Sequence, residues 1–195
     1  MVSRYSPPDF TIIHMRLSFN RAIADSQLVE MSLRIDELTG WDASPEVVVL
    51  AASASWVLVR DLDNGLYPDG FTAISRRLVR SLHTTQHRIF RKRSLQDDGV
   101  WPRLVRVPSI ELTSATTILK FLRKRNKLAI VLTETFTEWH SLHCRVEDVT
   151  DREAVLLGFD GAGKWEPRQK RLAISDITRI RFGSRYLDFY RKHMA

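Results

Sequence analysis

The sequence predicts an α+β protein in which an irregular N-terminal region, residues 1–108, precedes a five-stranded barrel domain in residues 109–195. Three observations lead to this fold class. Two early segments alternate apolar and polar residues, which is typical of half-buried strands. Longer apolar segments with a helix-start signal follow them. Five short strand-like segments then follow a short amphipathic helix, and this order predicts a small closed barrel.

Composition and length fit an ordinary folded protein. Of the 195 residues, 44% are hydrophobic and 27% are charged, which excludes a disordered or collagen-like chain. The single cysteine, Cys144, excludes an internal disulfide framework. No apolar segment reaches the roughly 18 residues of a membrane-spanning helix, and the first ten residues lack the apolar core of a secretory signal. We therefore expect a soluble, cytoplasmic protein.

The two alternating segments, residues 10–19 and 28–36, predict a hairpin connected by residues 20–27. In the first segment Ile13, Met15 and Leu17 form one face, with polar side chains between them. The second segment has an alternative, because Leu28 and Ile35 also fit the spacing of an amphipathic helix that ends at Gly40.

Two helices are predicted next. Ser44-Pro45-Glu46 combines a capping hydroxyl, a proline at the first helical position and an acid in the first turn, and predicts a buried helix over about 45–62. Two buried strands, at 47–50 and 56–59, are the alternative. A second helix is predicted over about 71–92, followed by a connector at 94–109 that is rich in Gly, Pro and charge. The inner face of the second helix would be Ile74, Leu78, Leu82, Ile89 and Phe90.

The C-terminal third reads as a short helix and five strands. Ser114 is the predicted cap of the helix, with Ile118, Leu119 and Leu122 on its apolar side. The expected strands are residues 128–134, 141–149, 152–160, 170–175 and 177–182, and a brief helix or a tail is expected at 186–193. No repeat of fixed period is evident along the chain.

Residues 113–183 resemble the Sm-like family, which includes the LSm proteins and bacterial Hfq. The resemblance is carried by ILKFLRKRNKLAIVL, CRVEDVTDREAVLL and KRLAISDITRI, where a short basic helix precedes alternating aliphatic strands. It implies a barrel that binds RNA and associates through its strand edges. Lys170 and Arg171 match the basic pair ahead of the penultimate strand, displaced by one residue. Cys144 stands where the family carries a glycine, and residues 150–153 offer no base-stacking aromatic ring.

Charge is distributed unevenly along the chain. Residues 1–70 carry 5 Lys and Arg against 10 Asp and Glu, residues 71–127 carry 14 against 3, and residues 128–195 carry 11 against 10. A basic middle segment of this kind is either a surface for a polyanion or the complement of the acidic first third.

The predicted helix at 71–92 would gather basic side chains into one stripe on one face, because they are spaced 4, 3, 4 and 4 residues apart. The residues of the stripe are Arg76, Arg80, His83, His87 and Arg91. Such a row suits a line of phosphates, although a solvated face, or one paired with the acidic first third, is the alternative. Trp165, in a polar loop, is a further candidate contact. The candidate nucleic-acid-binding residues are Arg76, Arg77, Arg80, His83, His87, Arg88, Arg91, Lys92, Arg93, Arg123, Lys124, Lys127, Trp165, Lys170 and Arg171.

No catalytic, metal or cofactor motif is evident. His140 and His143 would point to opposite faces of a strand, so a metal site with Cys144 is disfavoured. The segment 160–164, DGAGK, lacks the serine or threonine of a phosphate loop and is predicted to be a hairpin turn. Five acids in the first third do not single out a catalytic pair; they are Asp36, Glu37, Asp61, Asp63 and Asp69.

We therefore expect a non-catalytic protein that binds nucleic acid, RNA rather than DNA, and takes no cofactor. The alternative is a protein-interaction or assembly subunit whose barrel is a docking or oligomerisation module, with an acidic protein or a second copy as its partner. An enzyme with a site in the N-terminal half is a third hypothesis.

Overall fold

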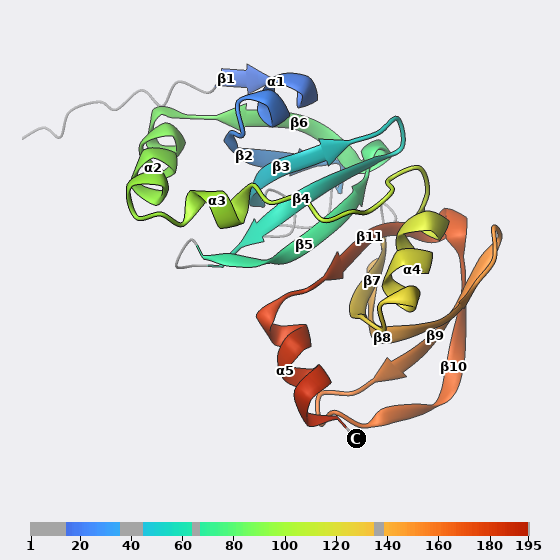
Figure 1. Cartoon of the computed structure of the whole chain (residues 1–195). Helices are drawn as coiled ribbons and strands as arrows, with labels where there is room; N and C mark the ends of the chain where they lie inside the picture. Colours follow the sequence, from blue (N-terminus) through green and yellow to red (C-terminus); the bar gives the residue numbers. More distant parts are fainter. Residues whose placement is uncertain (1–14, 36–44, 64–66, 135–138, 195) are drawn as a thin grey trace, which may run out of the picture.

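The computed structural model describes residues 15–35, 45–63, 67–134 and 139–194. In these residues, all the strands belong to one antiparallel sheet with the order β1-β6-β2-β3-β4-β5-β11-β7-β8-β9-β10 (Figure 1). The strands are β1 (Met15–Leu17), β2 (Leu28–Leu33), β3 (Glu46–Ala52), β4 (Trp56–Leu62), β5 (Pro68–Ser75), β6 (Val79–Thr84), β7 (Leu128–Glu134), β8 (Trp139–Val149), β9 (Glu153–Phe159), β10 (Trp165–Ala173) and β11 (Ile177–Phe182). The helices are α1 (Phe19–Ala24), α2 (Gln86–Asp97), α3 (Trp101–Leu104), α4 (Ala115–Lys124) and α5 (Arg185–His193), with 3-10 turns η1 (Arg76–Leu78) and η2 (Ile174–Asp176).

The sheet is built from two units with the same order of elements, which we call the first unit (α1 and β2–β6) and the second unit (α4 and β7–β11). In each unit a helix precedes four strands, a 3-10 turn and a fifth strand, and the fifth strand lies beside the first. Strand irregularities recur as well. In the second strand of each unit, one residue has no partner in the strand pairing: Leu50 in the first unit and Glu147 in the second. The fifth strand has such an extra residue as well, Arg80 in the first unit and Thr178 in the second. The chain is therefore a structural repeat, although no repeat is evident in its sequence.

The two units are joined edge to edge by β5 and β11. At this joint the ring of Phe71 stacks on that of Phe182, with centroids 5.3 Å apart. The main hydrophobic core extends across the joint, from Leu58 in β4 to Ile118 in α4 and Ile180 in β11. The division into domains at residue 108 stays a prediction.

The α+β class is confirmed, but the closed five-stranded barrel is wrong. The sheet is open: within the second unit β10 pairs with β9, and β11 pairs with β7 and with β5 of the first unit. Both edges of β11, the fifth strand of the second unit, are thus paired, one with β7 and the other with β5 of the first unit. β11 therefore does not pair with β10, the fourth strand, to close a barrel. Figure 1 shows the sheet of the second unit curving around α4.

The helix predicted over 45–62 is wrong, and the two-strand alternative is confirmed as β3 and β4. Valine-rich segments favour strands, and both strands are buried through most of their length. Ser53 forms the turn between them, because its hydroxyl accepts hydrogen bonds from the backbone nitrogens of Ser55 and Trp56 at 3.1 and 2.9 Å.

The helix predicted over 71–92 is also wrong, and the basic stripe that it would have carried does not form. The segment instead supplies β5, η1, β6 and the first half of α2. Apolar residues spaced for a helix here serve two strands, whose partners β4, β11 and β2 come from elsewhere in the chain. The α-helix begins only at Gln86, where the hydroxyl of Thr85 caps the backbone nitrogen of Arg88.

The N-terminal hairpin is wrong in its pairing. β2 confirms the strand predicted at 28–36, whereas the segment at 10–19 contributes only the short β1, and its residues 10–14 lie outside the described part of the chain. β1 and β2 do not pair with each other, because β6 lies between them. The predicted connections also hold helices: α1 occupies most of 20–27, and α3 lies within 94–109.

The elements of the second unit match the prediction closely. Ser114 and Thr117 form a capping box at the start of α4, which satisfies backbone donors that an uncapped helix leaves unpaired. Four of the five strands follow as expected, whereas β10 begins at Trp165 rather than at residue 170 and gives way to η2 at Ile174; α5 follows β11. The turn at 160–164 joins β9 to β10, and the carboxylate of Asp160 accepts hydrogen bonds from the backbone nitrogens of Ala162 and Lys164.

Candidate anion-binding site

The basic side chains of α2 that face the sheet are paired with acids of the first third. Arg88 donates to Glu30 at 2.6 Å and lies 3.5 Å from Glu46. Arg91 donates to Glu46 at 2.8 Å. All four side chains are at most 29% exposed. These arginines therefore balance the acidic strands β2 and β3, as the alternative interpretation of the basic segment expected.

Three further candidates contact backbone carbonyls. Arg76 donates to Ser53 at 3.0 Å, Arg77 to Ser175 at 2.7 Å and Lys92 to Asp25 at 2.5 Å. Burial lowers the pKa of Lys92, and the nearby charge of Asp25 opposes this effect. These contacts tie η1 and α2 to neighbouring loops.

The candidates of the second unit are largely paired as well. Arg123 lies 3.0 Å from Asp148, Lys170 lies 3.0 Å from Glu166, and Arg171 pairs with Glu153. Trp165 begins β10 rather than standing in a loop. Its ring packs edge-on against Phe159 and beneath the guanidinium of Arg145.

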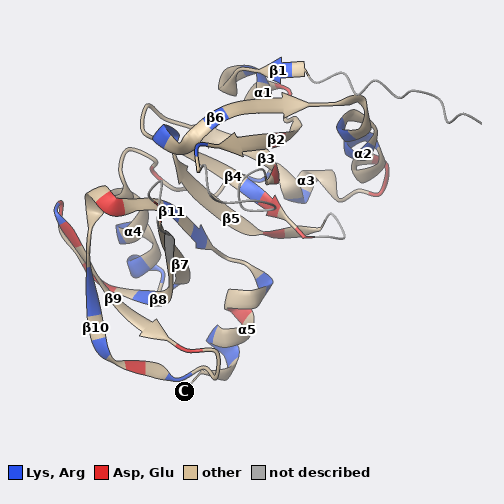
Figure 2. Cartoon of the chain, turned by 180° about the vertical axis from the view of Figure 1, so that it is seen from behind, with Lys and Arg blue, Asp and Glu red and all other residues tan. Residues whose placement is uncertain are grey.

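The remaining candidates are spread over separate elements. Arg80 and His83 lie on β6, and the His83 ring contacts the Ser81 hydroxyl at 2.8 Å. His87 and Arg93 lie on α2, Lys124 ends α4 and Lys127 follows it. Figure 2 shows α2 at the far end of the first unit, whereas α4 lies within the second unit. The predicted stripe and the predicted cluster therefore do not form one continuous surface.

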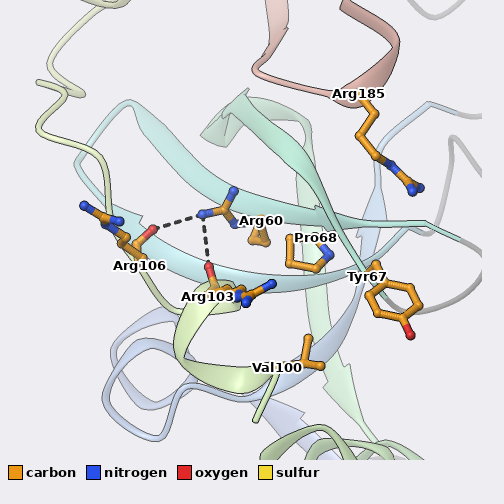
Figure 3. Close-up of a pocket in the computed structure, with 7 residues that line it drawn as sticks. All are labelled: Arg60, Tyr67, Pro68, Val100, Arg103, Arg106 and Arg185. Atoms are coloured by element: carbon orange, nitrogen blue, oxygen red, sulfur yellow. Dashed lines mark hydrogen bonds between the residues drawn. The ribbon is translucent and has the colours of Figure 1, made fainter. Parts of the chain in front are cut away.

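A different group of cations gathers around a pocket of about 500 Å³ between β4, α3 and the start of α5. We call it the arginine pocket; four arginines line it, together with Tyr67 (Figure 3). They are Arg60, Arg103, Arg106 and Arg185.

Arg60 is the buried member of the pocket, with only 9% of its surface exposed. Its guanidinium lies 3.6 Å above the Phe71 ring and donates to four carbonyls, those of Gly70, Arg103, Leu104 and Arg106, at 3.2–3.5 Å. Three of these carbonyls belong to the end of α3 and the segment after it. A cation at a helix C-terminus satisfies carbonyls that lack helical partners, so Arg60 fixes the position of residues 103–106.

The charge of Arg60 is retained although it is buried. Burial lowers its pKa to about 10, and the neighbouring Asp61 opposes this effect. A pKa of about 10 still leaves the guanidinium protonated at neutral pH. Its hydrogen-bond acceptors are neutral carbonyls, and so they do not cancel its charge.

Arg103 and Arg106 supply the exposed positive charge of the pocket. Both side chains are exposed, and neither has an ion pair or a side-chain hydrogen bond with any residue that the structure describes. Their backbone carbonyls are held by Arg60 (Figure 3), so both side chains extend from a fixed backbone. Guanidinium groups placed in this way suit the oxygens of a phosphate or carboxylate.

Arg185 differs, because two carboxylates neutralise it. Asp63 and Asp69 both pair with its guanidinium, Asp69 at 3.5 Å. The carboxylate of Asp61 accepts a hydrogen bond from the hydroxyl of Thr72 at 2.5 Å, and burial raises the pKa of this carboxyl. The acids of the first third that the structure describes are thus engaged, while Asp36 and Glu37 lie outside the described residues.

Tyr67 adds an aromatic surface beside these cations. It is 58% exposed, which is high for so large a side chain, and its backbone nitrogen donates to Asp63 at 2.8 Å. An exposed ring beside unpaired guanidinium groups offers stacking and charge together, which is how proteins hold single-stranded nucleic acid.

No protein-family model, curated protein or solved structure matches this chain. Among the described residues, no group of three or more His, Cys, Asp and Glu side chains is placed to hold a metal ion. No helix there is long and apolar enough to cross a membrane.

The arginine pocket is absent from the sequence-based candidates. Its members come from β4, the end of α3 and α5, and Arg60 lies 43 residues from Arg103. One signal was available: Arg60 directly follows the apolar segment Trp56–Val59, and a cation at the end of a buried strand needs a partner.

Proposed function

We propose that this protein is a non-catalytic nucleic-acid-binding protein that holds single-stranded RNA at the arginine pocket. The observation that carries the proposal is the pair of exposed arginines, Arg103 and Arg106, which have no ion pair within the described part of the chain and lie beside the exposed ring of Tyr67. The two guanidinium groups bind backbone phosphates, and the ring stacks on a base. Arg60 takes a positioning role beneath them.

The preference for RNA rests on the resemblance of residues 113–183 to Sm-like proteins. The features that support it are the short basic helix α4 ahead of five strands, and a tight turn, η2, between the last two. The arginine pocket lies at the joint between the units, so RNA contacts there are independent of the stacking position that this chain lacks.

The test is the affinity for a short fluorescein-labelled single-stranded oligoribonucleotide, measured by fluorescence anisotropy. Arg103→Glu with Arg106→Glu should weaken binding by roughly 10–100-fold, because two charge-assisted contacts become repulsive. Arg80→Glu with Arg93→Glu is the matched control. It changes net charge equally at exposed positions away from the pocket, and should keep affinity within about threefold. Equal losses in both variants would refute the pocket as the contact site.

A protein-interaction or assembly subunit is the second candidate. The pairing of Arg88 and Arg91 with Glu30 and Glu46 favours it, since these two arginines of α2 are neutralised within the chain. The two candidates differ in the purified protein. Copurifying nucleic acid supports RNA binding. It is detected as a raised ratio of the nucleic-acid absorbance to the protein absorbance of the preparation. A nucleic-acid-free preparation that forms a defined oligomer supports the assembly subunit.

A further inference from the structure

A second pocket lies between the two units, at the end of β5 that is remote from the arginine pocket. Its volume is about 240 Å³, smaller than a typical site for a drug-sized ligand, so it suits a small chemical group. We call it the serine pocket. Ser55, Ser75 and Arg77 line it from the first unit, and Ala115 and Ser175 line it from the second.

Ser75 brings an unused hydroxyl to this pocket. The residue is only 9% exposed. Its hydroxyl makes no hydrogen bond with any residue that the structure describes, although Ser75 stands at the cap position of η1. Side chains alternate between the two faces of a strand, so Ser75 points the same way as Ala73, toward the core around Ala115 and Ile177. Since buried hydroxyls are nearly always hydrogen-bonded, a ligand or a water is needed to complete this one.

The start of α4 forms part of the opposite wall. The backbone nitrogens of Ala115 and Thr116 donate to no other residue within the described ranges, because the first amides of a helix have no acceptor inside it. α4 has 10 residues, so its dipole adds partial positive charge at this end. Free amides and the dipole together favour an anion here.

Arg77 adds a full positive charge. Its guanidinium donates to the carbonyl of Ser175 at 2.7 Å, and in the described part of the chain no carboxylate pairs with it, so its other N–H groups are available. Among the lining residues that the structure describes there is no Asp or Glu. Glu111 and Asp176 lie close by in the chain, but both are exposed and accept hydrogen bonds from hydroxyls, those of Thr113 and Ser175.

Hydrogen bonds between the units hold the walls of the pocket in place. The bond from Arg77 to Ser175 joins η1 to η2. The hydroxyl of Ser53 donates to the carbonyl of Leu112 at 2.7 Å, and joins the turn after β3 to the segment ahead of α4. The donors that face the pocket are therefore positioned before a ligand arrives, which lowers the entropic cost of binding.

We propose that the serine pocket binds a phosphate group, held by the Arg77 guanidinium, the Ser75 hydroxyl and the first amides of α4. All three are hydrogen-bond donors and come from different elements, as a tetrahedral oxyanion that accepts from several directions requires. The group is inorganic phosphate or the phosphate end of a larger molecule, since both present the same oxygens. This inference goes beyond RNA binding at the arginine pocket and does not depend on it.

The first test is isothermal titration calorimetry with inorganic phosphate. The full chain carries Arg103→Glu and Arg106→Glu, so that the arginine pocket does not contribute. In this background Arg77→Gln should weaken phosphate binding by roughly tenfold or more, because a charge-assisted contact is lost. Arg76→Gln is the matched control. Arg76 is also exposed on η1 and donates to a backbone carbonyl, and its change should keep affinity within about threefold.

Ser75→Ala, in the same background, tests the buried hydroxyl separately. It should weaken phosphate binding by roughly fivefold or more, because one hydrogen bond to a charged group is lost. Equal phosphate affinities with and without the Arg77 and Ser75 changes would overturn the proposal. Absence of binding at millimolar phosphate would also overturn it, since the pocket then holds only water.

A third measurement identifies the source of the phosphate, in the chain with its native arginine pocket. The probes are two fluorescein-labelled oligoribonucleotides that end in a phosphate or in a hydroxyl. A terminal phosphate that raises affinity for the wild type, but not for Ser75→Ala, supports the site and assigns it to the end of a nucleic acid. Equal affinities of the two probes, with inorganic phosphate still bound, support a site for free phosphate. Phosphate binding without any RNA binding supports the serine pocket and refutes only the proposed RNA function.

Discussion

Arg60 shows how one buried cation can build a site for an anion without contacting it. Its hydrogen bonds go to carbonyls of residues 103–106 and Gly70, so its charge orders a segment of backbone that would otherwise lack partners. The side chains of Arg103 and Arg106 then face solvent from a fixed position. Preorganised donors of this kind lower the entropic cost of binding.

Removing the Arg60 guanidinium should therefore lower both stability and affinity. Arg60→Met leaves the carbonyls of residues 103–106 without their donor, and we expect a loss of about 1–3 kcal/mol in the free energy of unfolding. Urea denaturation followed by tryptophan fluorescence measures it. Arg103→Met, at an exposed position, should change stability by less than about 0.5 kcal/mol. Equal stabilities of the two variants would contradict the positioning role.

His143 gives the fold a dependence on acid. Its ring lies between those of Phe159 and Tyr186, with centroids 5.7 and 5.4 Å away. Burial lowers the pKa of His143, and the positive charge of Arg181 lowers it further. In the unfolded chain the imidazole protonates near its usual pKa of about 6.5. Below that pH the unfolded state binds more protons than the folded state, so stability falls as the pH falls.

His143→Phe should remove this contribution. The difference in unfolding free energy between pH 7.5 and pH 5 should be smaller in this variant than in the wild type, as measured by urea denaturation at both pH values. His87→Gln removes an exposed histidine from α2 and controls for the loss of one imidazole. A His143→Phe variant with the full wild-type pH dependence would show that another group is responsible.

At the scale of elements, a buried ion pair fixes β11 against β7. The carboxylate of Glu134 is fully buried and accepts hydrogen bonds from Nε and Nη2, on one edge of the Arg179 guanidinium, whose side chain is 5% exposed. The hydroxyl of Thr178, the extra residue of β11, lies 2.9 Å from the same carboxylate. The extra residue in β11 thus places the Thr178 hydroxyl next to the Glu134–Arg179 ion pair. In a regular strand, neighbouring side chains such as those of Thr178 and Arg179 would point to opposite faces of the sheet.

Breaking this pair should be costly, because it leaves one buried charge without its partner. Glu134→Ala should lower the unfolding free energy by about 3–5 kcal/mol, as measured by chemical denaturation. Replacing both residues, as Glu134→Leu with Arg179→Leu, should cost less than the single change, since no unpaired charge remains. A double variant less stable than Glu134→Ala would contradict this account.

How well each element could be predicted depended on whether its own residues determine it. α4 and β7–β11 follow from an evident cap at Ser114 and from short segments bounded by turn residues. The segment at 71–92 misled because Ile74, Leu78 and Leu82 satisfy a helical spacing as well as strand burial. Only the partner strands on both sides of β5 and β6 decide between the two, and these partners come from distant parts of the chain.

At the scale of the whole molecule, the basic middle segment serves two purposes. Arg88 and Arg91 neutralise acids of β2 and β3, whereas Arg103 and Arg106 remain available at the arginine pocket. Counting charge along the sequence could find the excess but could not divide it in this way, because pairing depends on the order of strands in the sheet. The repeat of two units was hidden for a similar reason, since it is conserved in topology and strand irregularities rather than in residue identity.

Contacts of Arg103 and Arg106 with the phosphates of a single-stranded RNA should make binding depend on salt. The most direct measurement is the salt dependence of RNA affinity for the wild type and for Arg103→Gln with Arg106→Gln. Each phosphate contact on a single strand contributes about 0.7 to the slope of log affinity against log salt concentration. We expect a slope that is shallower by about 1.4 in the variant, because two phosphate contacts are lost. Identical slopes for the two proteins, or wild-type binding that does not respond to salt, would contradict it.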